Sequence, residues 1–185
     1  MIYKEKVIGL VRHGETDWNT MRRMQGRENI PLNSAGIEQS YRLGQEIIKE
    51  GTTWDLIVSS PLIRADETAR ILQNALGHLE IITMEYFVER EFGAASGLTR
   101  SDVSKLYPDA RIPGREDNDA LLHRVQRGLD FLVNDLPQKN ILLVTHGEVM
   151  RTIYRIIGIK HKIDKKPGNA SIDIVHIDNH ILLAE

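Results

Sequence analysis

The sequence predicts an α/β protein, a three-layer α/β/α sandwich with a mostly parallel central sheet and an antiparallel edge strand. Short apolar runs alternate along the chain with longer segments in which apolar residues recur at helical spacing. That order is typical of strands joined by crossover helices. The 185 residues fit one domain, because domains commonly span about 100–200 residues. We therefore expect residues 1–185 to form a single domain.

The expected strands are continuous apolar runs, a pattern typical of strands buried on both faces. They lie at residues 6–11, 54–59, 79–83 and 140–145, with a terminal pair at 171–177 and 181–184. Alternation with helices makes the early strands parallel to one another.

The expected helices lie between these runs. Asn33 offers an N-cap for a helix to about Glu50, and Gly51 then ends it. Pro61 suits the first turn of the next helix, which runs to about residue 76. Further helices are expected near 100–106, 116–135 and 148–157. Residues 85–115 are less regular, with three glycines and two prolines, and we expect them to form part of a substrate-pocket cover.

The composition excludes several classes of function. A formal net charge of -2 gives no reason to expect nucleic acid or a membrane surface as partner. The chain has no cysteine, which excludes disulfides, thiolate metal sites and cysteine nucleophiles. The N-terminal residues do not resemble a signal peptide, and no apolar run approaches the ~18 residues of a membrane span. We therefore expect a cytoplasmic protein.

Two His-Gly pairs follow directly after predicted strands. Arg12-His13-Gly14 follows one run, and Thr145-His146-Gly147 follows another. Ligands bind beyond the carboxyl ends of parallel strands, so both pairs should meet at one sheet edge. A neutral imidazole can attack phosphorus when its other nitrogen is held protonated by an acceptor, and the turn at Gly14 lets the backbone supply one. Gly147 and the helix after it add backbone N–H groups that favour an anion.

Arg12 and Arg64 add the charge that such a site needs. Arg64 follows Ser59-Ser60-Pro61 at the end of another predicted strand. A guanidinium can bind two oxygens of one phosphate through two parallel hydrogen bonds, and it stays charged at any working pH. These residues also have structural alternatives. Arg12 and Arg64 could each be a surface ion-pair partner, Arg64 with Asp66 or Glu67, and His146 could make only a helix-capping contact. The convergence of these residues at strand ends favours the anion site.

A metal site is the main chemical alternative, with His13, His146 and Glu89 as ligands. The chain has no His-Glu-x-x-His spacing and no cysteine, and neighbouring arginines would repel a divalent cation. We therefore expect neither a metal nor a cofactor.

Several ordered motifs resemble those of the histidine phosphatase superfamily, also called the phosphoglycerate mutase-like family. They are Arg12-His13-Gly14-Glu15-Thr16, Ser59-x-Pro61-Leu62-x-Arg64-Ala65-x-Glu67-Thr68-Ala69, Glu89-x-x-x-Gly93-x-x-x-Gly97 and Thr145-His146-Gly147, supported by Asn19, Gln25-Gly26 and Pro31-Leu32-x-x-x-Gly36. The resemblance extends from about residue 7 to residue 175.

The resemblance implies a role for each matching residue. His13 would be the phospho-accepting nucleophile, and Arg12, Arg64 and His146 would form the phosphate pocket. Glu89 would donate a proton to the leaving group, which is otherwise a poorly leaving alkoxide. A solvated Glu89 that pairs with Arg90 is the structural alternative.

A second group of residues is expected to bind substrate. Asn19, Gln25 and Gly147 would contact the phosphate or the substrate, while Arg90 and Arg100 would face the pocket mouth. Turn, cap or solvated surface roles remain equally open for Asn19, Gln25, Arg90 and Arg100. Glu148 would lie near the entrance, where its charge would disfavour highly anionic substrates.

The resemblance leaves more than one activity open. The chain between Gly97 and Asp117 is short for the cover of a cofactor-dependent mutase, and Phe92 and Thr99-Arg100 depart from the mutase pattern. We therefore expect a phosphatase that acts on a small phosphorylated metabolite, with phosphoglycerate mutase as the alternative. A catalytically silent binding module is a third. The protein would be a monomer or a homodimer.

Overall fold

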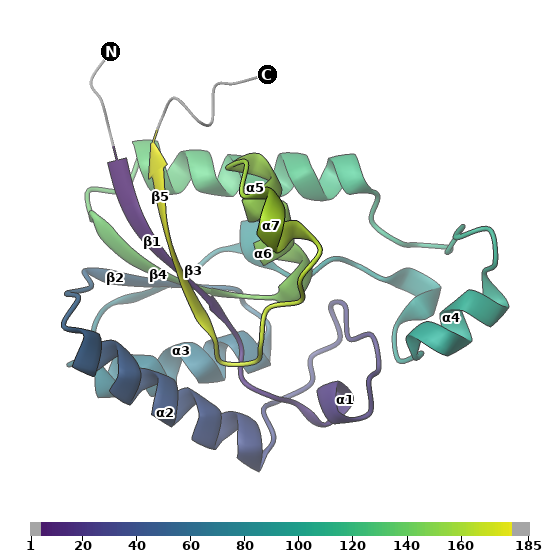
Figure 1. Ribbon diagram of the computed structural model, residues 1–185, viewed down its shortest axis with the longest axis horizontal. Helices are drawn as coiled ribbons and strands as arrows, with labels where there is room; N and C mark the ends of the chain where they lie inside the picture. The colour runs from purple at the N-terminus through teal and green to yellow at the C-terminus, as the bar shows by residue number, and fades with distance from the viewer. Residues whose placement is uncertain (1–4, 179–185) are drawn as a thin grey trace.

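The computed structural model describes residues 5–178, which form a five-stranded mixed sheet with helices on both faces (Figure 1). The strands are β1 (Glu5–Arg12), β2 (Leu56–Ser59), β3 (Ile81–Thr83), β4 (Asn140–Thr145) and β5 (Ile172–Asp178). The helices are α1 (Asp17–Thr20), α2 (Ser34–Glu50), α3 (Ile63–Ala75), α4 (Arg100–Leu106), α5 (Asn118–Asn134), α6 (Gly147–Ile156) and α7 (Lys160–Ile163), with 3-10 turns η1 (Glu85–Phe87) and η2 (Gly93–Ala95).

The sheet has the order β3-β2-β4-β1-β5, with every pair parallel except β1 with β5. In register, Leu10 of β1 is opposite Leu143 of β4 on one side and Asp173 of β5 on the other. The predicted fold class, with its antiparallel edge strand, is confirmed. Since β1 and β4 are neighbours and parallel, His13 and His146 leave the sheet side by side.

The core consists of two layers, one on each face of the sheet. Ile8 and Leu10 of β1 pack with α5 and α6, while Val11 packs with α2 and α3. In β4 the same alternation places Leu143 in the first cluster and Val144 in the second. Successive side chains of a strand point to opposite faces, so a continuous apolar run is required where helices cover both.

The ends of α2 follow the predicted signals. The Asn33 side chain accepts a hydrogen bond from the Gly36 backbone N–H at 2.8 Å. Gly51 ends the helix with φ 75°, a left-handed conformation that costs glycine little. The predicted bounds of α4 and β4 also match the structure.

Other predicted boundaries need correction. Pro61 lies before the helix rather than in its first turn, because α3 begins at Ile63 with Leu62 as N-cap. The strand predicted over 54–59 begins at Leu56, and the one over 79–83 begins at Ile81. The strand predicted over 181–184 lies outside the described residues. Within residues 5–178, no helix combines the length and the apolar character that crossing a bilayer requires.

Candidate active site

His13 follows β1 directly, and backbone contacts fix its ring. Its Nδ1 lies 2.7 Å from the carbonyl oxygen of Gly14. A carbonyl only accepts hydrogen bonds, so Nδ1 carries the proton and Nε2 keeps its lone pair. Burial lowers the pKa of His13 well below its usual 6.5, and the charges of Arg64 and Arg12 add to this. The ring is therefore a neutral imidazole with Nε2 ready to act as a nucleophile.

The loop that carries His13 is packed tightly against α2. A Cβ atom on Gly14 would lie 2.4 Å from the carbonyl oxygen of Gly36, and one on Gly36 would lie 2.1 Å from that of Glu15. The Gly14 N–H donates to Thr68 Oγ1 at 3.0 Å. Close approach of two backbones explains both glycines and makes this turn rigid.

Arg12 and Arg64 are both almost fully buried, with 4% and 1% of their surface exposed. Arg12 Nη1 donates to the carbonyl oxygen of Pro167 at 2.6 Å. Arg64 donates from Nη1 to Glu28 and from Nη2 to Gly26, each at 2.7 Å. The Nε of each guanidinium has no partner among the described residues. Burial lowers each pKa to about 10, so both remain cationic at neutral pH.

The ion pair considered for Arg64 is not formed. The Asp66 carboxylate accepts instead from Arg70 Nε at 2.8 Å, and Glu67 accepts from the Leu32 backbone N–H at 2.8 Å. Asp66 and Glu67 therefore do not compete with another anion for the guanidinium of Arg64.

His146 lies beside His13, with 5.2 Å between the ring centroids and 55° between the planes. Its Nε2 is 2.7 Å from Ser60 Oγ, and its Nδ1 is buried without a partner among the described residues. The ring makes no capping bond to α6, so that alternative does not hold. Burial lowers the His146 pKa well below 6.5, with a further contribution from Arg64.

Glu89 lines the same cavity as Arg12 and Arg64, and its charge acts on both guanidinium groups. One oxygen accepts from the Arg90 backbone N–H at 2.9 Å, and the other from the Glu148 backbone N–H at 3.4 Å. Burial raises the Glu89 pKa above 4.5, outweighing that hydrogen bond and the charges of Arg64 and Arg12. A buried carboxyl with a raised pKa holds its proton more readily and suits a general acid.

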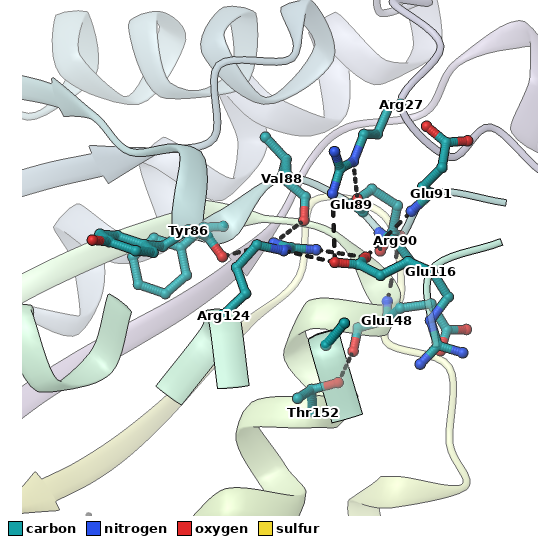
Figure 2. A network of polar contacts seen from close by, with 12 residues as sticks. Arg27, Tyr86, Val88, Glu89, Arg90, Glu91, Glu116, Arg124, Glu148 and Thr152 are labelled. Atoms are coloured by element: carbon teal, nitrogen blue, oxygen red, sulfur yellow. Dashed lines mark hydrogen bonds and ion pairs between the residues drawn. The ribbon is translucent and has the colours of Figure 1, made fainter. Parts of the chain in front are cut away.

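A network of charged groups holds the backbone around Glu89 (Figure 2). Arg124 donates from Nη1 to the carbonyl oxygens of Tyr86 and Val88, at 2.8 and 2.9 Å. Its Nε and Nη2 bind both carboxylate oxygens of Glu116, at 2.9 and 2.8 Å. Arg124 thus fixes the backbone that leads into Glu89.

One cavity of about 860 Å³ brings most of the predicted site together. Its lining includes the predicted catalytic residues Arg12, His13, Arg64 and Glu89. It also includes the predicted substrate-binding residues Asn19, Gln25, Gly147 and Arg100. His146 lies behind this lining, fully buried.

The structure does not bring Arg90 to the cavity. Its Nη2 donates to Asn118 Oδ1 at 2.8 Å, and its side chain is buried away from the lining. The predicted contact of Arg90 with substrate therefore has no support here. The Arg90 side chain does not pair with Glu89 either, since only its backbone N–H does.

Comparison with known proteins identifies the family. The sequence pattern of the histidine phosphatase superfamily (branch 1) matches residues 8–181. The chain belongs to this superfamily. The buried histidine pair and its two arginines belong to the motifs that resemble this superfamily.

Relatives within the superfamily include both phosphatases and mutases. The uncharacterized phosphatase PhoE of Bacillus subtilis is 42% identical over 146 residues, which cover 79% of this chain and 74% of that protein. A 2,3-bisphosphoglycerate-dependent phosphoglycerate mutase of Parvibaculum lavamentivorans is 30% identical over 162 residues, 80% of this chain and 77% of that protein. A phosphatase activity fits this membership, and mutase relatives are also present.

A solved structure of the superfamily shares the fold. It is a mycobacterial glucosyl-3-phosphoglycerate phosphatase in complex with VO3, with a TM-score of 0.80 and 26% identity, covering 92% of each chain. The match over nearly the whole chain confirms the three-layer architecture.

Several residues around this histidine phosphatase cavity were not predicted. The lining also includes Arg22, Arg23, Arg151 and Lys166. Outside the lining, Ser60 bonds to His146 and Asn169 bonds to the loop of His13. Asn169 Nδ2 donates to the His13 carbonyl at 3.2 Å and to Asn19 Oδ1 at 3.0 Å. Arg151 lies one helical turn after Gly147, a spacing that would have indicated the same end of α6. For Lys166, no local pattern indicates the site.

Proposed function

We propose that this protein hydrolyses small phosphomonoesters through a phosphohistidine at His13. The observation that carries the proposal is the pairing of a nucleophilic Nε2, fixed by the Nδ1 contact to Gly14, with two buried arginines. Within residues 5–178, the Nε atoms of both arginines and Nδ1 of His146 are buried without a hydrogen-bond partner. Buried polar groups are nearly always bonded, so their clustering supports a site for an oxyanion.

The first step transfers the phosphoryl group to the enzyme. His13 Nε2 forms a bond to phosphorus while the bond from phosphorus to the leaving oxygen breaks. Glu89, in its protonated form, gives its proton to that oxygen, so the product leaves as an alcohol. Arg12, Arg64 and His146 stabilise the charge that spreads over the equatorial oxygens.

The second step releases the phosphate. A water molecule attacks the phosphohistidine, and the Glu89 carboxylate takes a proton from it. The nitrogen–phosphorus bond breaks, His13 regains its lone pair, and Glu89 is again protonated. Each group returns to its starting state, and in this proposal the chain's own residues supply the nucleophile, the proton donor and the cations.

The remaining predicted residues support substrate binding in this proposal. Asn19, Gln25, Gly147 and Arg100 line the cavity, and residues 85–115 form part of its cover through Glu89, Phe92, Thr99, Arg100 and Ser101. We also propose a cytoplasmic location, no nucleic-acid or membrane partner, and a monomer or homodimer.

The test is hydrolysis of p-nitrophenyl phosphate with a chelator present. We expect activity in the wild-type protein, its loss in His13→Ala, and its retention in the matched control His123→Ala, whose side chain lies on the exposed face of α5. Rapid quenching with a 32P-labelled donor should trap an acid-labile, base-stable label in the wild-type protein. Absence of label during turnover would contradict the phosphohistidine.

The mutase alternative is tested separately, because a mutase relative is 30% identical. The protein is supplied with 3-phosphoglycerate and 2,3-bisphosphoglycerate, and products are followed over time. Release of inorganic phosphate supports the phosphatase. Rapid isomerisation without phosphate release would establish the mutase instead.

A further inference from the structure

The cavity carries far more positive charge than the protein as a whole. Seven basic side chains and three acidic ones line it, whereas the whole chain has a formal net charge of -2. A local excess of this kind, surrounded by low-dielectric walls, focuses the electric field on an anionic ligand. The excess is larger than the phosphate pocket alone explains, since that pocket uses only two of the seven basic side chains, Arg12 and Arg64.

Three of the additional cations come from separate parts of the fold. Arg100 is the first residue of α4, Arg151 lies in α6, and Lys166 lies between α7 and β5. All three line the same cavity as Arg12. Their mutual proximity is reflected in their pKa values: that of Lys166 is lowered by burial and by the charges of Arg12, Arg100 and Arg151.

Arg151 is held by an acidic partner of its own. Its guanidinium forms an ion pair with the Glu148 carboxylate three residues earlier, and the two side chains are only 22% and 23% exposed. The backbone N–H of Glu148 donates to the Glu89 carboxylate (Figure 2). Arg151 therefore lies one helical turn after the residue whose backbone binds Glu89, the proposed proton donor.

Lys166 is held by the segment in which it lies. The carbonyl oxygen of the next residue, Pro167, accepts from Arg12 Nη1 at 2.6 Å. Asn169 in the same segment donates to the carbonyl oxygens of His13 and Gly14, each at 3.2 Å. The segment that carries Lys166 is thus hydrogen-bonded to Arg12, His13 and Gly14.

We propose that Arg100, Arg151 and Lys166 form a second anion-binding subsite, with Glu148 as its specificity-determining counter-ion. The preferred substrates are then phosphomonoesters that carry a further anionic group, either a carboxylate or a second phosphate. This inference rests on the proposed function and names the substrate class of the same site.

The role of Glu148 follows from competition for Arg151. A second anionic group of the substrate must replace the Glu148 carboxylate as the partner of Arg151, and it must approach that carboxylate. Both effects weaken binding of the second anion. Glu148 therefore sets how strongly the subsite favours a doubly anionic substrate over a singly anionic one.

The test compares substrates that differ in a single group. For the carboxylate, 3-phosphoglycerate is compared with glycerol 3-phosphate; for the second phosphate, fructose 1,6-bisphosphate is compared with fructose 6-phosphate. The measured quantity is the ratio of kcat/KM within each pair. We expect a ratio well above one in at least one pair, which also identifies the kind of anion, and a fall of this ratio as ionic strength rises.

Variants connect that ratio to the proposed residues. Arg151→Gln and Lys166→Gln should each lower it by about five- to tenfold, the effect of one partly exposed charged contact. Glu148→Gln should raise it, and Arg151→Gln should remove most of that increase in the double variant. Arg155→Gln is the matched control, because Arg155 lies on the exposed side of α6 and outside the cavity lining, and it should leave the ratio unchanged.

The outcomes separate this inference from the proposed function. If all substrates are hydrolysed but the ratio is near one in both pairs, or is unmoved by Arg151→Gln and Lys166→Gln, the second subsite is wrong and the phosphatase stands. If no phosphomonoester is hydrolysed, the proposed function is wrong. In that case, the Kd values of the same compounds for the wild-type protein are measured by calorimetry. Equal Kd values within both pairs would overturn the second subsite.

Discussion

Arg124 and Glu116 form a two-bond ion pair, with nitrogen–oxygen distances of 2.9 and 2.8 Å, behind the segment that carries Glu89 (Figure 2). Neither side chain is more than 13% exposed. Because Arg124 also binds the carbonyl oxygens of Tyr86 and Val88, it positions Glu89 without contacting the cavity. Glu89 is a catalytic group in the proposed mechanism, whereas Arg124 acts only through it.

Arg124→Gln should therefore impair proton donation in particular. We expect loss of about 1–3 kcal/mol of folding free energy from groups left without partners, and a decrease in kcat of about tenfold from misplacement of Glu89. The decrease should be larger for an alkyl phosphate than for p-nitrophenyl phosphate, whose leaving group needs little protonation. A purely structural role would reduce both substrates equally.

The control for that variant lies one turn further along α5. The guanidinium of Arg127 lies 5.7 Å from the centre of the Tyr86 ring. The carbonyl oxygens of Tyr86 and Val88 accept hydrogen bonds from Arg124 instead. Arg127→Gln should cost less than about 1 kcal/mol, the value of an exposed cation–π contact, and leave the ratio between the two substrates unchanged.

The main elements of the fold were predictable from the sequence because each carries a local signal. The apolar run at 140–145 predicts a strand that helices cover on both faces, and in the structure its residues alternate between the two core clusters. Asn33 and Gly51 mark the ends of α2 through their own hydrogen bond and backbone conformation. By contrast, α1 and α7 each have four residues, and one helical turn is too short to show a period.

Gly36→Ala provides a test of how closely α2 holds the nucleophile loop. Alanine normally favours a helix over glycine by about 0.5–1 kcal/mol, but here its Cβ would lie 2.1 Å from the carbonyl oxygen of Glu15. Because backbone must move, we expect a net destabilisation of about 1–3 kcal/mol and a decrease in kcat of up to about 100-fold, measured by urea unfolding and steady-state kinetics.

Gly44→Ala is the matched control on the same helix. Its Cβ would lie 2.9 Å from that of Ala75 in α3, so it is also crowded, but it lies away from His13. It should lower stability without a comparable decrease in kcat. Equal losses of kcat in the two variants would show that α2 does not position the nucleophile specifically.

The central site was predictable because its residues follow strands that run parallel. His13 and His146 leave neighbouring strands in register, and Arg64 follows the next strand at the same edge. Arg151 and Lys166 were missed because the charges of a cavity depend on which loops the fold brings together. Arg90 shows the opposite case: it adjoins Glu89 in sequence, yet its side chain turns to Asn118.

The raised pKa of Glu89 predicts a pH dependence of catalysis. The acid form of Glu89 is needed to protonate an alkyl leaving group, and it is lost as pH rises through the pKa, which burial shifts above 4.5. The ratio of kcat/KM for an alkyl phosphate to that for p-nitrophenyl phosphate should therefore fall with increasing pH. Glu89→Gln should lower this ratio and remove its pH dependence.

Glu85→Gln serves as the comparison for that experiment, since Glu85 is exposed in the turn just before Glu89. It should keep the wild-type profile. A pH-independent ratio in the wild-type protein would mean that Glu89 is not the proton donor in the step that limits kcat/KM.

The lowered pKa of His146 predicts how stability varies with pH. In the unfolded chain this imidazole takes up a proton below about 6.5, whereas burial and Arg64 keep it neutral in the folded protein. Its contribution to stability is then complete above that pH and is lost as pH falls, at up to about 1.4 kcal/mol per pH unit. Between pH 7 and 5, His146→Asn should reduce the slope of the unfolding free energy against pH, because about one proton fewer is taken up on unfolding. Urea unfolding at several pH values measures the slope; the exposed His123→Asn should retain the wild-type slope, and an equally steep slope in His146→Asn would show that His146 titrates alike in both states.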